Sequence, residues 1–393
     1  MQLTDNAKVI NIMERTLNLV SPRIIDHGKR VAYRLFKALH PLGVYDDDRL
    51  RDICILGLLH DIGAYKTEDV DSILGLDTKN TWDHSVYGYL FLKYFSPIES
   101  LAPVVLFHHA DDYQMAHLSE KHQRLARLLK HVDRADIYQH LHSNGVCVDC
   151  HGIDEDAEFN RIFRQVSFSS EVVEAYLKMI VYSIDFRSPQ TMIHTFAATH
   201  VAEALAGLSG VDEGEIKSLT AGALMHDIGK MGTPLHILES INKKLSPADM
   251  EIMKQHVVLS EEILSGCVND KILNIAVNHH EKLNGKGYPK GLDECALPYL
   301  DRLMAVADVF SAISVARSYQ DAFPKEKAIS ILSNFRDNHM LDQSVIALAI
   351  DHYDEIIQSL NIKSKPVIAA YEAMTEESRW IHDKIVNGQY DIV

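Results

Sequence analysis

Five histidines and two aspartates between residues 194 and 308 occur in an order that suits metal binding. They are His194, His226, Asp227, His256, His279, His280 and Asp308. If Asp227 is shared between two divalent ions, these side chains give about four bonds to each ion, and water or substrate oxygens can complete six-coordination. A single buried histidine is more often a hydrogen-bonded core residue, but seven such residues in one order are hard to explain in that way.

Two ions roughly 3.5–4 Å apart would favour hydrolysis of a phosphate ester, because they acidify a bound water and hold a phosphoryl oxygen in line with the resulting hydroxide. Adjacent residues on a helix point about 100° apart, so we expect His279 and His280 to flank the site from two sides. Lys230 lies three residues after Asp227 and shares its helix face. Its ammonium can stabilise phosphate charge; alternatively, it is a solvated lysine at a helix end marked by Gly229.

The same order of residues occurs earlier in the chain. The text LLHDIGAYKTEDV at 58–70 resembles LMHDIGKMGTPLH at 224–236, and the separation of 33 residues between His27 and His60 matches the 32 between His194 and His226. Two similar blocks in one order indicate a tandem duplication. The first block supplies a second candidate metal site, formed by His27, His60, Asp61, His84, His108, His109 and Asp133.

The elements that position these residues are predicted to be helices nearly throughout. Asp212 and Ser246 precede apolar residues at helical spacing and are expected to be N-caps, as are Asp47, Asp270 and Asp301. No series of alternating strands is evident, and any β structure is expected as short hairpins, for instance at 283–298. The predicted fold is therefore all-α, with two tandem helical domains at 1–150 and 160–393.

Bulk properties narrow the partners. A formal net charge of −16 argues against a nucleic-acid polymer or an anionic membrane as the main partner, although bound metal ions can reverse the local field for a small anionic substrate. Residues 1–19 lack the pattern of a signal peptide, no apolar run has the length of a membrane span, and the five cysteines are irregularly spaced. We expect a cytoplasmic protein, and a homodimer is a further hypothesis.

The second block resembles the HD-GYP family of the HD superfamily. The matching text is ALMHDIGKMGTP (223–234), MKQHVVLSEEIL (253–264), NHHEKLNGKGYPKGL (278–292) and RLMAVADVFSAISVARSY (302–319). The resemblance implies an all-helical HD-type domain, a centre of two divalent ions (iron or manganese), and hydrolysis of cyclic di-GMP or 3′,3′-cyclic GMP-AMP to the linear dinucleotide. It assigns the seven His and Asp residues to the metals. It places Lys230, Gly287, Tyr288, Pro289 and Arg317 at the substrate, with Asp227 and Lys230 as the catalytic residues.

Four departures from the family pattern limit this transfer. Members with a third metal carry Glu where this chain has Gln190, so two ions are expected. Ser311 stands where many members have Asp, Asn284 replaces a frequent Asp, and Gln320 replaces a basic residue. Two alternative functions remain: an HD-type nucleotide phosphohydrolase, and a non-catalytic receptor for cyclic dinucleotides.

The first block lacks the substrate-handling residues. Ala64 replaces the lysine, and Asp111 and Asp112 follow the histidine pair in place of the Gly-Tyr-Pro loop, where they are expected to repel a phosphodiester. One hypothesis is a regulatory or scaffolding HD-type domain that binds metal without hydrolysing cyclic dinucleotides. The alternative is a relic whose histidines only pack.

Overall fold

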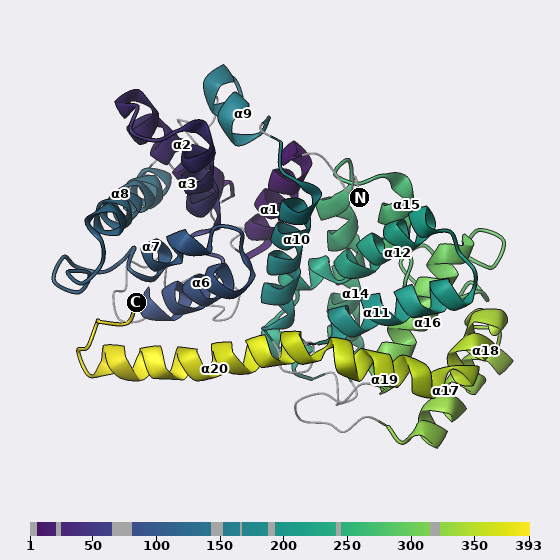
Figure 1. The fold of residues 1–393 in the computed structure, drawn as a ribbon. Helices are drawn as coiled ribbons and strands as arrows, with labels where there is room; N and C mark the ends of the chain where they lie inside the picture. Colours follow the sequence, from purple (N-terminus) through teal and green to yellow (C-terminus); the bar gives the residue numbers. More distant parts are fainter. Residues whose placement is uncertain are drawn as a thin grey trace. The chain divides into compact units, whose positions relative to one another are not determined.

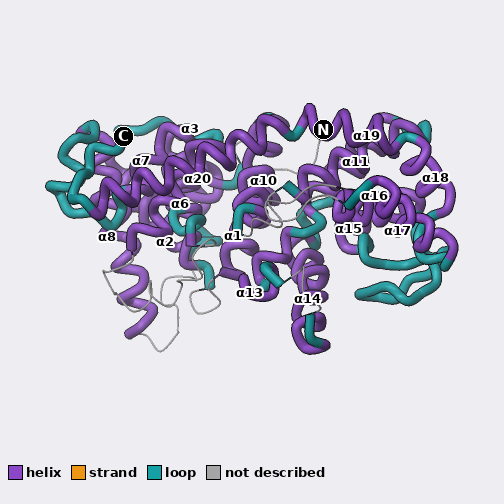
Figure 2. The backbone as a smooth tube through the Cα atoms, turned by 90° about the horizontal axis from the view of Figure 1, so that it is seen from below, coloured by secondary structure: helices purple, strands orange, loops and turns teal. Residues whose placement is uncertain are grey.

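The computed structural model describes residues 6–20, 25–64, 81–142, 152–165, 167–187, 193–240, 245–314 and 323–393. Within these ranges the chain consists of helices joined by turns and loops, and no strand is present (Figures 1 and 2). The all-α prediction is confirmed. The predicted hairpin at 283–298 amounts to a single antiparallel bridge between Asn284 and Asp293.

The described residues group into two compact units. The C-terminal unit comprises Ile184–Tyr371, and the N-terminal unit comprises Thr4–Ser183 together with Glu372–Val393. These limits differ from the predicted domains at 1–150 and 160–393, because residues 160–183 and the end of the chain group with the N-terminal unit. The domain boundaries themselves stay a prediction.

Helices of the N-terminal unit pack against both near and distant neighbours in the sequence. Helix α2 lies against α3 and α8, and α6 lies against α7. The helices are α1 (Asn6–Val20), α2 (His27–Leu39), η1 (His40–Leu42), α3 (Asp47–Leu59), α6 (Thr81–Phe95), η2 (Glu99–Leu101), α7 (Ala102–Leu106), α8 (Glu120–His142), α9 (Ala157–Phe163) and α10 (Ser170–Asp185).

The C-terminal unit is built around α11, which packs against α12 and α16. Its helices are α11 (His194–Leu208), α12 (Glu213–Met225), η4 (Ile228–Gly232), α13 (Leu235–Leu238), α14 (Pro247–Leu264), α15 (Asp270–Val277), α16 (Tyr299–Ser314), α17 (Lys325–Asp337), α18 (Gln343–Asp351), α19 (Tyr353–Lys363) and α20 (Lys365–Val386). The last of these continues past Tyr371, so its later turns belong to the N-terminal unit.

Side-chain caps begin several of these helices. The Asp212 carboxylate accepts hydrogen bonds from the backbone N–H groups of Gly214 and Glu215, and the Ser246 hydroxyl accepts one from Asp249, as predicted. Three other cap predictions were wrong. Asp46 caps α3 in place of Asp47, Asn269 caps α15 in place of Asp270, and Asp301 lies inside the first turn of α16.

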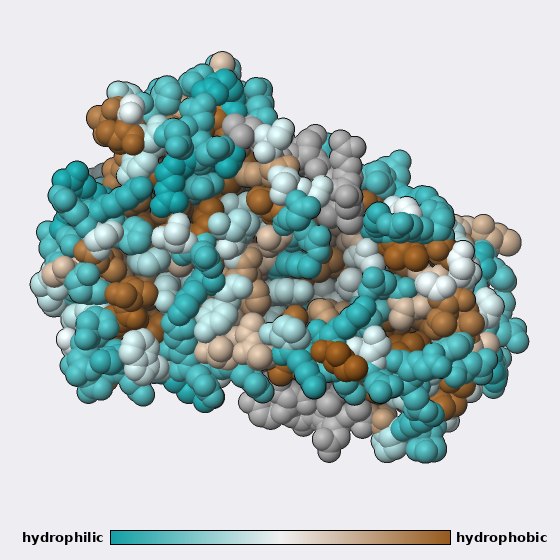
Figure 3. Space-filling view, viewed as in Figure 1, coloured by the Kyte–Doolittle hydropathy of each residue, from teal (hydrophilic) through white to brown (hydrophobic). Residues whose placement is uncertain are grey.

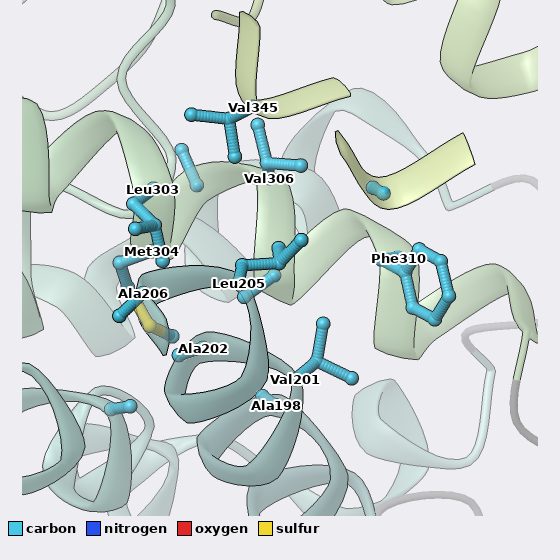
Figure 4. Packing of buried hydrophobic residues seen from close by; sticks show 14 of the residues in the cluster. Ala198, Val201, Ala202, Leu205, Ala206, Leu303, Met304, Val306, Phe310 and Val345 are labelled. Atoms are coloured by element: carbon cyan, nitrogen blue, oxygen red, sulfur yellow. The ribbon is translucent and has the colours of Figure 1, made fainter. Parts of the chain in front are cut away.

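A continuous apolar core holds the C-terminal unit together. Figure 4 shows Val201 and Leu205 of α11 packed with Met304 and Phe310 of α16 and with Val345 of α18. The face seen in Figure 3 is largely hydrophilic, with apolar residues scattered over it. Among the described helices, none is both long and apolar enough to cross a bilayer.

Truncating the centre of this core should destabilise the C-terminal unit. Phe310 is fully buried and its ring lies 5.2 Å from that of Tyr353. Phe310→Ala is expected to lower the free energy of unfolding by about 3–5 kcal/mol, measured by urea denaturation. Ile362→Ala, at a position 61% exposed on α19, is the control and should change it by less than about 0.5 kcal/mol.

Candidate metal centre

The seven predicted ligands of the second block are brought together by five helices of the C-terminal unit. We call this set (His194, His226, Asp227, His256, His279, His280, Asp308) the C-terminal centre. His194 begins α11, His256 lies within α14, and Asp308 lies within α16. His226 and Asp227 directly follow α12, and His279 and His280 lie in the turn after α15. The expectation that both pairs are helical was wrong, because each helix ends just before its pair.

A close approach of η4 to α14 makes this assembly possible. A Cβ atom added at Gly229 would lie 1.9 Å from the backbone oxygen of His256, so no other residue fits without displacing α14. The Ser260 hydroxyl accepts from the Gly229 N–H at 2.9 Å and donates to the His226 carbonyl at 3.1 Å. This contact places His256 opposite the His-Asp pair.

Backbone hydrogen bonds fix the orientation of three imidazoles. The Nδ1 atoms of His226, His256 and His279 lie 2.7, 2.5 and 2.7 Å from the carbonyl oxygens of residues 223, 253 and 276. A carbonyl oxygen can only accept, so each Nδ1 carries the hydrogen. In the neutral ring, each Nε2 therefore presents a lone pair, and all three Nε2 atoms face Asp227.

The Asp227 carboxylate lies between two groups of these nitrogens. Its Oδ2 is 3.1 Å from His226 Nε2 and 3.6 Å from His194 Nε2, whereas its Oδ1 is 3.4 Å from His256 Nε2 and 4.0 Å from His279 Nε2. Asp308 has a similar position, with Oδ1 3.1 Å from His194 Nε2 and Oδ2 3.8 Å from His280 Nδ1. Ligands held at about 2.0–2.2 Å from one ion lie roughly this far apart.

The donor set fits divalent cations on a second ground. His226 Nε2 and Asp227 Oδ1 are buried atoms without a hydrogen-bond partner. Both are acceptors, and buried acceptors without a donor are costly. Cations on the two sides of Asp227 would satisfy both atoms, because His226 Nε2 faces Oδ2 whereas Oδ1 faces His256 and His279.

The protonation states also suit metal binding. Burial lowers the pKa of His256 to about 4 and that of His279 to about 3. Burial raises the pKa of Asp227, but the charges of His226 and Lys230 outweigh it and hold this pKa well below its ordinary value. Near neutral pH these histidines are neutral and this carboxylate is ionised, which is the form that binds metals.

Comparisons with known proteins find similar proteins and one matching family model. Residues 178–345 match the HD domain family model. The chain is 25% identical, over 90% of its length and 92% of the relative, to a 3′,3′-cGAMP-specific phosphodiesterase of Vibrio cholerae. It is 36% identical to a cyclic di-GMP phosphodiesterase response regulator of Xanthomonas campestris and 37% identical to a cyclic di-GMP phosphodiesterase of Thermotoga maritima, over 40% and 37% of the chain.

The chain spans most of the Vibrio relative but only 42% and 40% of the Xanthomonas and Thermotoga proteins. The chain is also similar to a crystal structure of a cyclic GMP-AMP-specific phosphodiesterase from Vibrio cholerae, with a TM-score of 0.51 and 16% identity. The alignment covers 88% of this chain and 98% of that protein, and it confirms the helical fold. The match of residues 178–345 to the HD domain family implies divalent metal binding.

The predicted substrate residues of the HD domain are placed as follows. Lys230 is nearly buried and forms an ion pair with Asp227. The Tyr288 ring lies 4.7 Å from that of His280, so the Gly-Tyr-Pro loop borders the centre. A Cβ at Gly287 would lie 2.4 Å from Glu281 Cα, which explains the glycine, and Pro289 follows in a cis peptide. Arg317, Gln190 and Gln320 lie outside the described residues.

The loop is organised by Glu281, which the sequence interpretation missed. This carboxylate is 1% exposed and accepts the backbone N–H groups of Lys290, Gly291 and Leu292 at 2.7, 3.1 and 2.9 Å. The available signal was an acidic residue between the histidine pair and a glycine-rich segment. Arg187 was also missed; it donates to the carbonyl oxygens of Lys230 and Met231 and holds η4 in place.

The N-terminal unit brings together the second predicted set of seven residues, which we call the N-terminal centre (His27, His60, Asp61, His84, His108, His109, Asp133). His60 and Asp61 follow α3, and His108 and His109 lie in the turn after α7, as in the C-terminal centre. A Cβ at Gly63 would lie 1.9 Å from the His84 carbonyl oxygen, the same clash as at Gly229.

One expectation about the N-terminal centre needs correction. Asp111 and Asp112 were expected to repel a phosphodiester. Asp111 is instead paired with Lys130 at 3.1 Å and Asp112 with Arg127 at 2.7 Å. These ion pairs offset much of the negative charge beside the histidine pair.

Glu281→Gln should separate loop organisation from metal binding. The amide keeps one acceptor oxygen but loses the charge that holds three N–H groups, so we expect unchanged metal content and a KM for cyclic dinucleotide raised about tenfold, corresponding to about 1.4 kcal/mol. Steady-state kinetics and metal analysis check this. Glu294→Gln, which alters an exposed carboxylate of the same loop, is the matched control. Loss of metal from Glu281→Gln would contradict the separation.

Proposed function

We propose that the C-terminal unit is a metal-dependent phosphodiesterase that hydrolyses a cyclic dinucleotide to the linear dinucleotide. The observation that carries the proposal is the Asp227 carboxylate, whose two oxygens face separate histidine groups beside the Gly-Tyr-Pro loop. Relatives of this chain are named as phosphodiesterases of 3′,3′-cGAMP and of cyclic di-GMP. Both compounds carry the phosphodiester that such a centre suits.

The seven residues of the C-terminal centre would hold two divalent ions, iron or manganese by the resemblance to the HD-GYP family. His194, His226 and Asp308 would face one ion and His256, His279 and His280 the other, with Asp227 shared. When bound, such ions acidify water and neutralise phosphoryl oxygens. Metal coordination would keep the five imidazoles neutral, so that with two carboxylates the ligands would carry two negative charges. Two divalent ions would then leave the centre positive and able to attract an anion despite the acidic chain.

The chain's own groups would then bind and orient the substrate. Lys230 Nζ lies beside Asp227, where an ammonium can neutralise a phosphate oxygen of the reacting diester. The Tyr288 ring lies against that of His280 beside the ligands, and the Lys254 ammonium lies 5.5 Å from its centroid. In the reaction a water oxygen forms a bond to phosphorus, one phosphorus–oxygen ester bond breaks, and the departing ribose oxygen takes a proton.

Product analysis tests this function. Manganese- or iron-loaded protein is incubated with cyclic di-GMP and, separately, with 3′,3′-cyclic GMP-AMP, and the products are separated by chromatography. We expect linear dinucleotide from at least one substrate, and no product from Asp227→Ala because the shared carboxylate is gone. Binding without product by fully metallated protein would indicate a receptor, and turnover of nucleoside triphosphates alone would indicate a nucleotide phosphohydrolase.

Lys230→Met should lower kcat about 100-fold while metal content stays that of the wild type, because the ammonium contacts the phosphate and is not a ligand. Metal analysis and kinetics on one preparation separate these quantities. Lys217→Met, at an exposed position on α12, is the matched control and should leave kcat unchanged. A Lys230→Met enzyme with wild-type kcat would show that this residue is not part of the site.

The cytoplasmic location and the homodimer remain predictions.

A further inference from the structure

We propose that the N-terminal centre is a second metal site, which binds a pair of divalent transition-metal ions shared by Asp61. The match to the HD domain family covers residues 178–345 and does not include the N-terminal centre. The proposal rests on the geometry of the N-terminal unit and is independent of the activity proposed for the C-terminal unit.

Asp61 lies between two groups of histidine nitrogens, as Asp227 does. Its Oδ2 is 3.7 Å from His27 Nε2 and 3.4 Å from His60 Nε2. Its Oδ1 is 3.8 Å from His84 Nε2 and 3.9 Å from His108 Nε2. These distances suit two ions on opposite sides of one carboxylate, each bonded at about 2.0–2.2 Å.

The remaining two residues of the set complete these groups. Asp133 Oδ1 is 3.2 Å from His27 Nε2 and 3.6 Å from His60 Nε2, on the first side. His109 Nε2 is 3.1 Å from His84 Nε2, on the second side. Each side therefore gathers three or more ligand atoms of the kinds that divalent transition metals prefer.

Five ligand atoms of the N-terminal centre are buried and have no hydrogen-bond partner. His60 Nδ1 donates to the Gly57 carbonyl at 2.8 Å and His108 Nδ1 to the Val105 carbonyl at 2.5 Å, so both Nε2 atoms present lone pairs. These two Nε2 atoms, His27 Nε2, Asp61 Oδ1 and Asp133 Oδ1 are buried without a partner. Protonation of His27 or His60 would give Asp133 a donor, but would still leave His108 Nε2, 3.9 Å from Asp61 Oδ1, without a partner.

A buried carboxylate, Asp136, supports the His27 ring of the N-terminal centre, and the described residues of the C-terminal unit place a hydroxyl at the corresponding position. Asp136 is 2% exposed and accepts from His27 Nδ1 at 2.9 Å, and Arg30 donates to the same carboxylate at 2.8 Å. At the corresponding place in the C-terminal unit, the Ser311 hydroxyl lies 3.3 Å from His194 Nδ1. Metal-bound histidines typically donate their second nitrogen to such a carboxylate. A relic whose histidines only pack has no need of this buried, arginine-held group.

The same unit lacks what a cyclic dinucleotide requires. Ala64 stands where the C-terminal unit has Lys230, and Ala110 stands where it has the loop-organising Glu281. The N-terminal centre therefore retains ligands and outer support without the substrate-handling residues. Its ions are expected to stabilise the unit rather than to hydrolyse the same substrate.

Metal counting on the full chain tests the proposal. Wild-type, Asp61→Ala, Asp227→Ala and double-variant proteins are loaded with Mn²⁺, desalted and analysed by mass spectrometry of the metal. With about two ions per centre, each single variant should hold half of the wild-type manganese and the double variant almost none. Wild-type manganese content in Asp61→Ala, or an Asp227→Ala protein free of manganese, would overturn the proposal.

Two milder variants guard against misfolding as the cause of metal loss. Asp136→Asn keeps all seven ligands and the side-chain shape, and should weaken Mn²⁺ binding at the N-terminal centre by about 10–100-fold. Ser311→Ala, the corresponding substitution at the C-terminal centre, should leave Mn²⁺ binding at the N-terminal centre unchanged. In the Asp227→Ala background, Mn²⁺ should raise the melting temperature, and this increase should be lost with Asp61→Ala. An Asp136→Asn protein with wild-type affinity at this centre would contradict the proposal. Product formation is not a readout, so failure of the phosphodiesterase proposal leaves the result intact.

Discussion

The position of the carboxylate that follows the second histidine of each centre, Asp227 after His226 and Asp61 after His60, is the constraint on which the rest of both units depends. A residue at the end of a helix can reach between two groups of imidazoles only if the next helix comes very close. Gly229 and Gly63 permit that approach, since a Cβ at either position would lie 1.9 Å from the carbonyl oxygen of the third histidine. The glycine of the HD-x-G text is thus a packing requirement that sets the ligand geometry.

The two units share this arrangement of seven ligands and a closely packed glycine, but they differ in the residues that surround it. In the C-terminal unit, Lys230 and the loop held by Glu281 lie beside the ligands. In the N-terminal unit, Asp136 and Arg30 occupy the outer layer instead. The C-terminal unit thus adds groups that can contact a phosphate, whereas the N-terminal unit adds groups that fix the orientation of an imidazole. The same inner ligands can therefore serve catalysis in one unit and stability in the other.

Much of this was accessible from the sequence, because ligand types, their order and their repetition survive without coordinates. Caps at Asp212 and Ser246 were predicted correctly, but Asp47 was wrong by one residue because the preceding Asp46 caps equally well. The contribution of Glu281 could not be predicted, since its three N–H partners become neighbours only when the loop folds back. The grouping of residues 372–393 with the N-terminal unit likewise depends on three-dimensional packing.

The energetics of buried acceptors argue that the N-terminal frame is maintained for a cation. Five ligand atoms there are buried without a hydrogen-bond partner, and a buried acceptor whose desolvation is not compensated is destabilising. A metal-free unit can relieve this only in part, because protonated His27 or His60 would donate to Asp133 but His108 Nε2 would still lack a partner. Substitution of one histidine by an apolar residue would relieve part of that penalty, yet all seven ligands and the outer Asp136 are present. Bound cations remove the conflict, because they convert converging lone pairs from a cost into bonds.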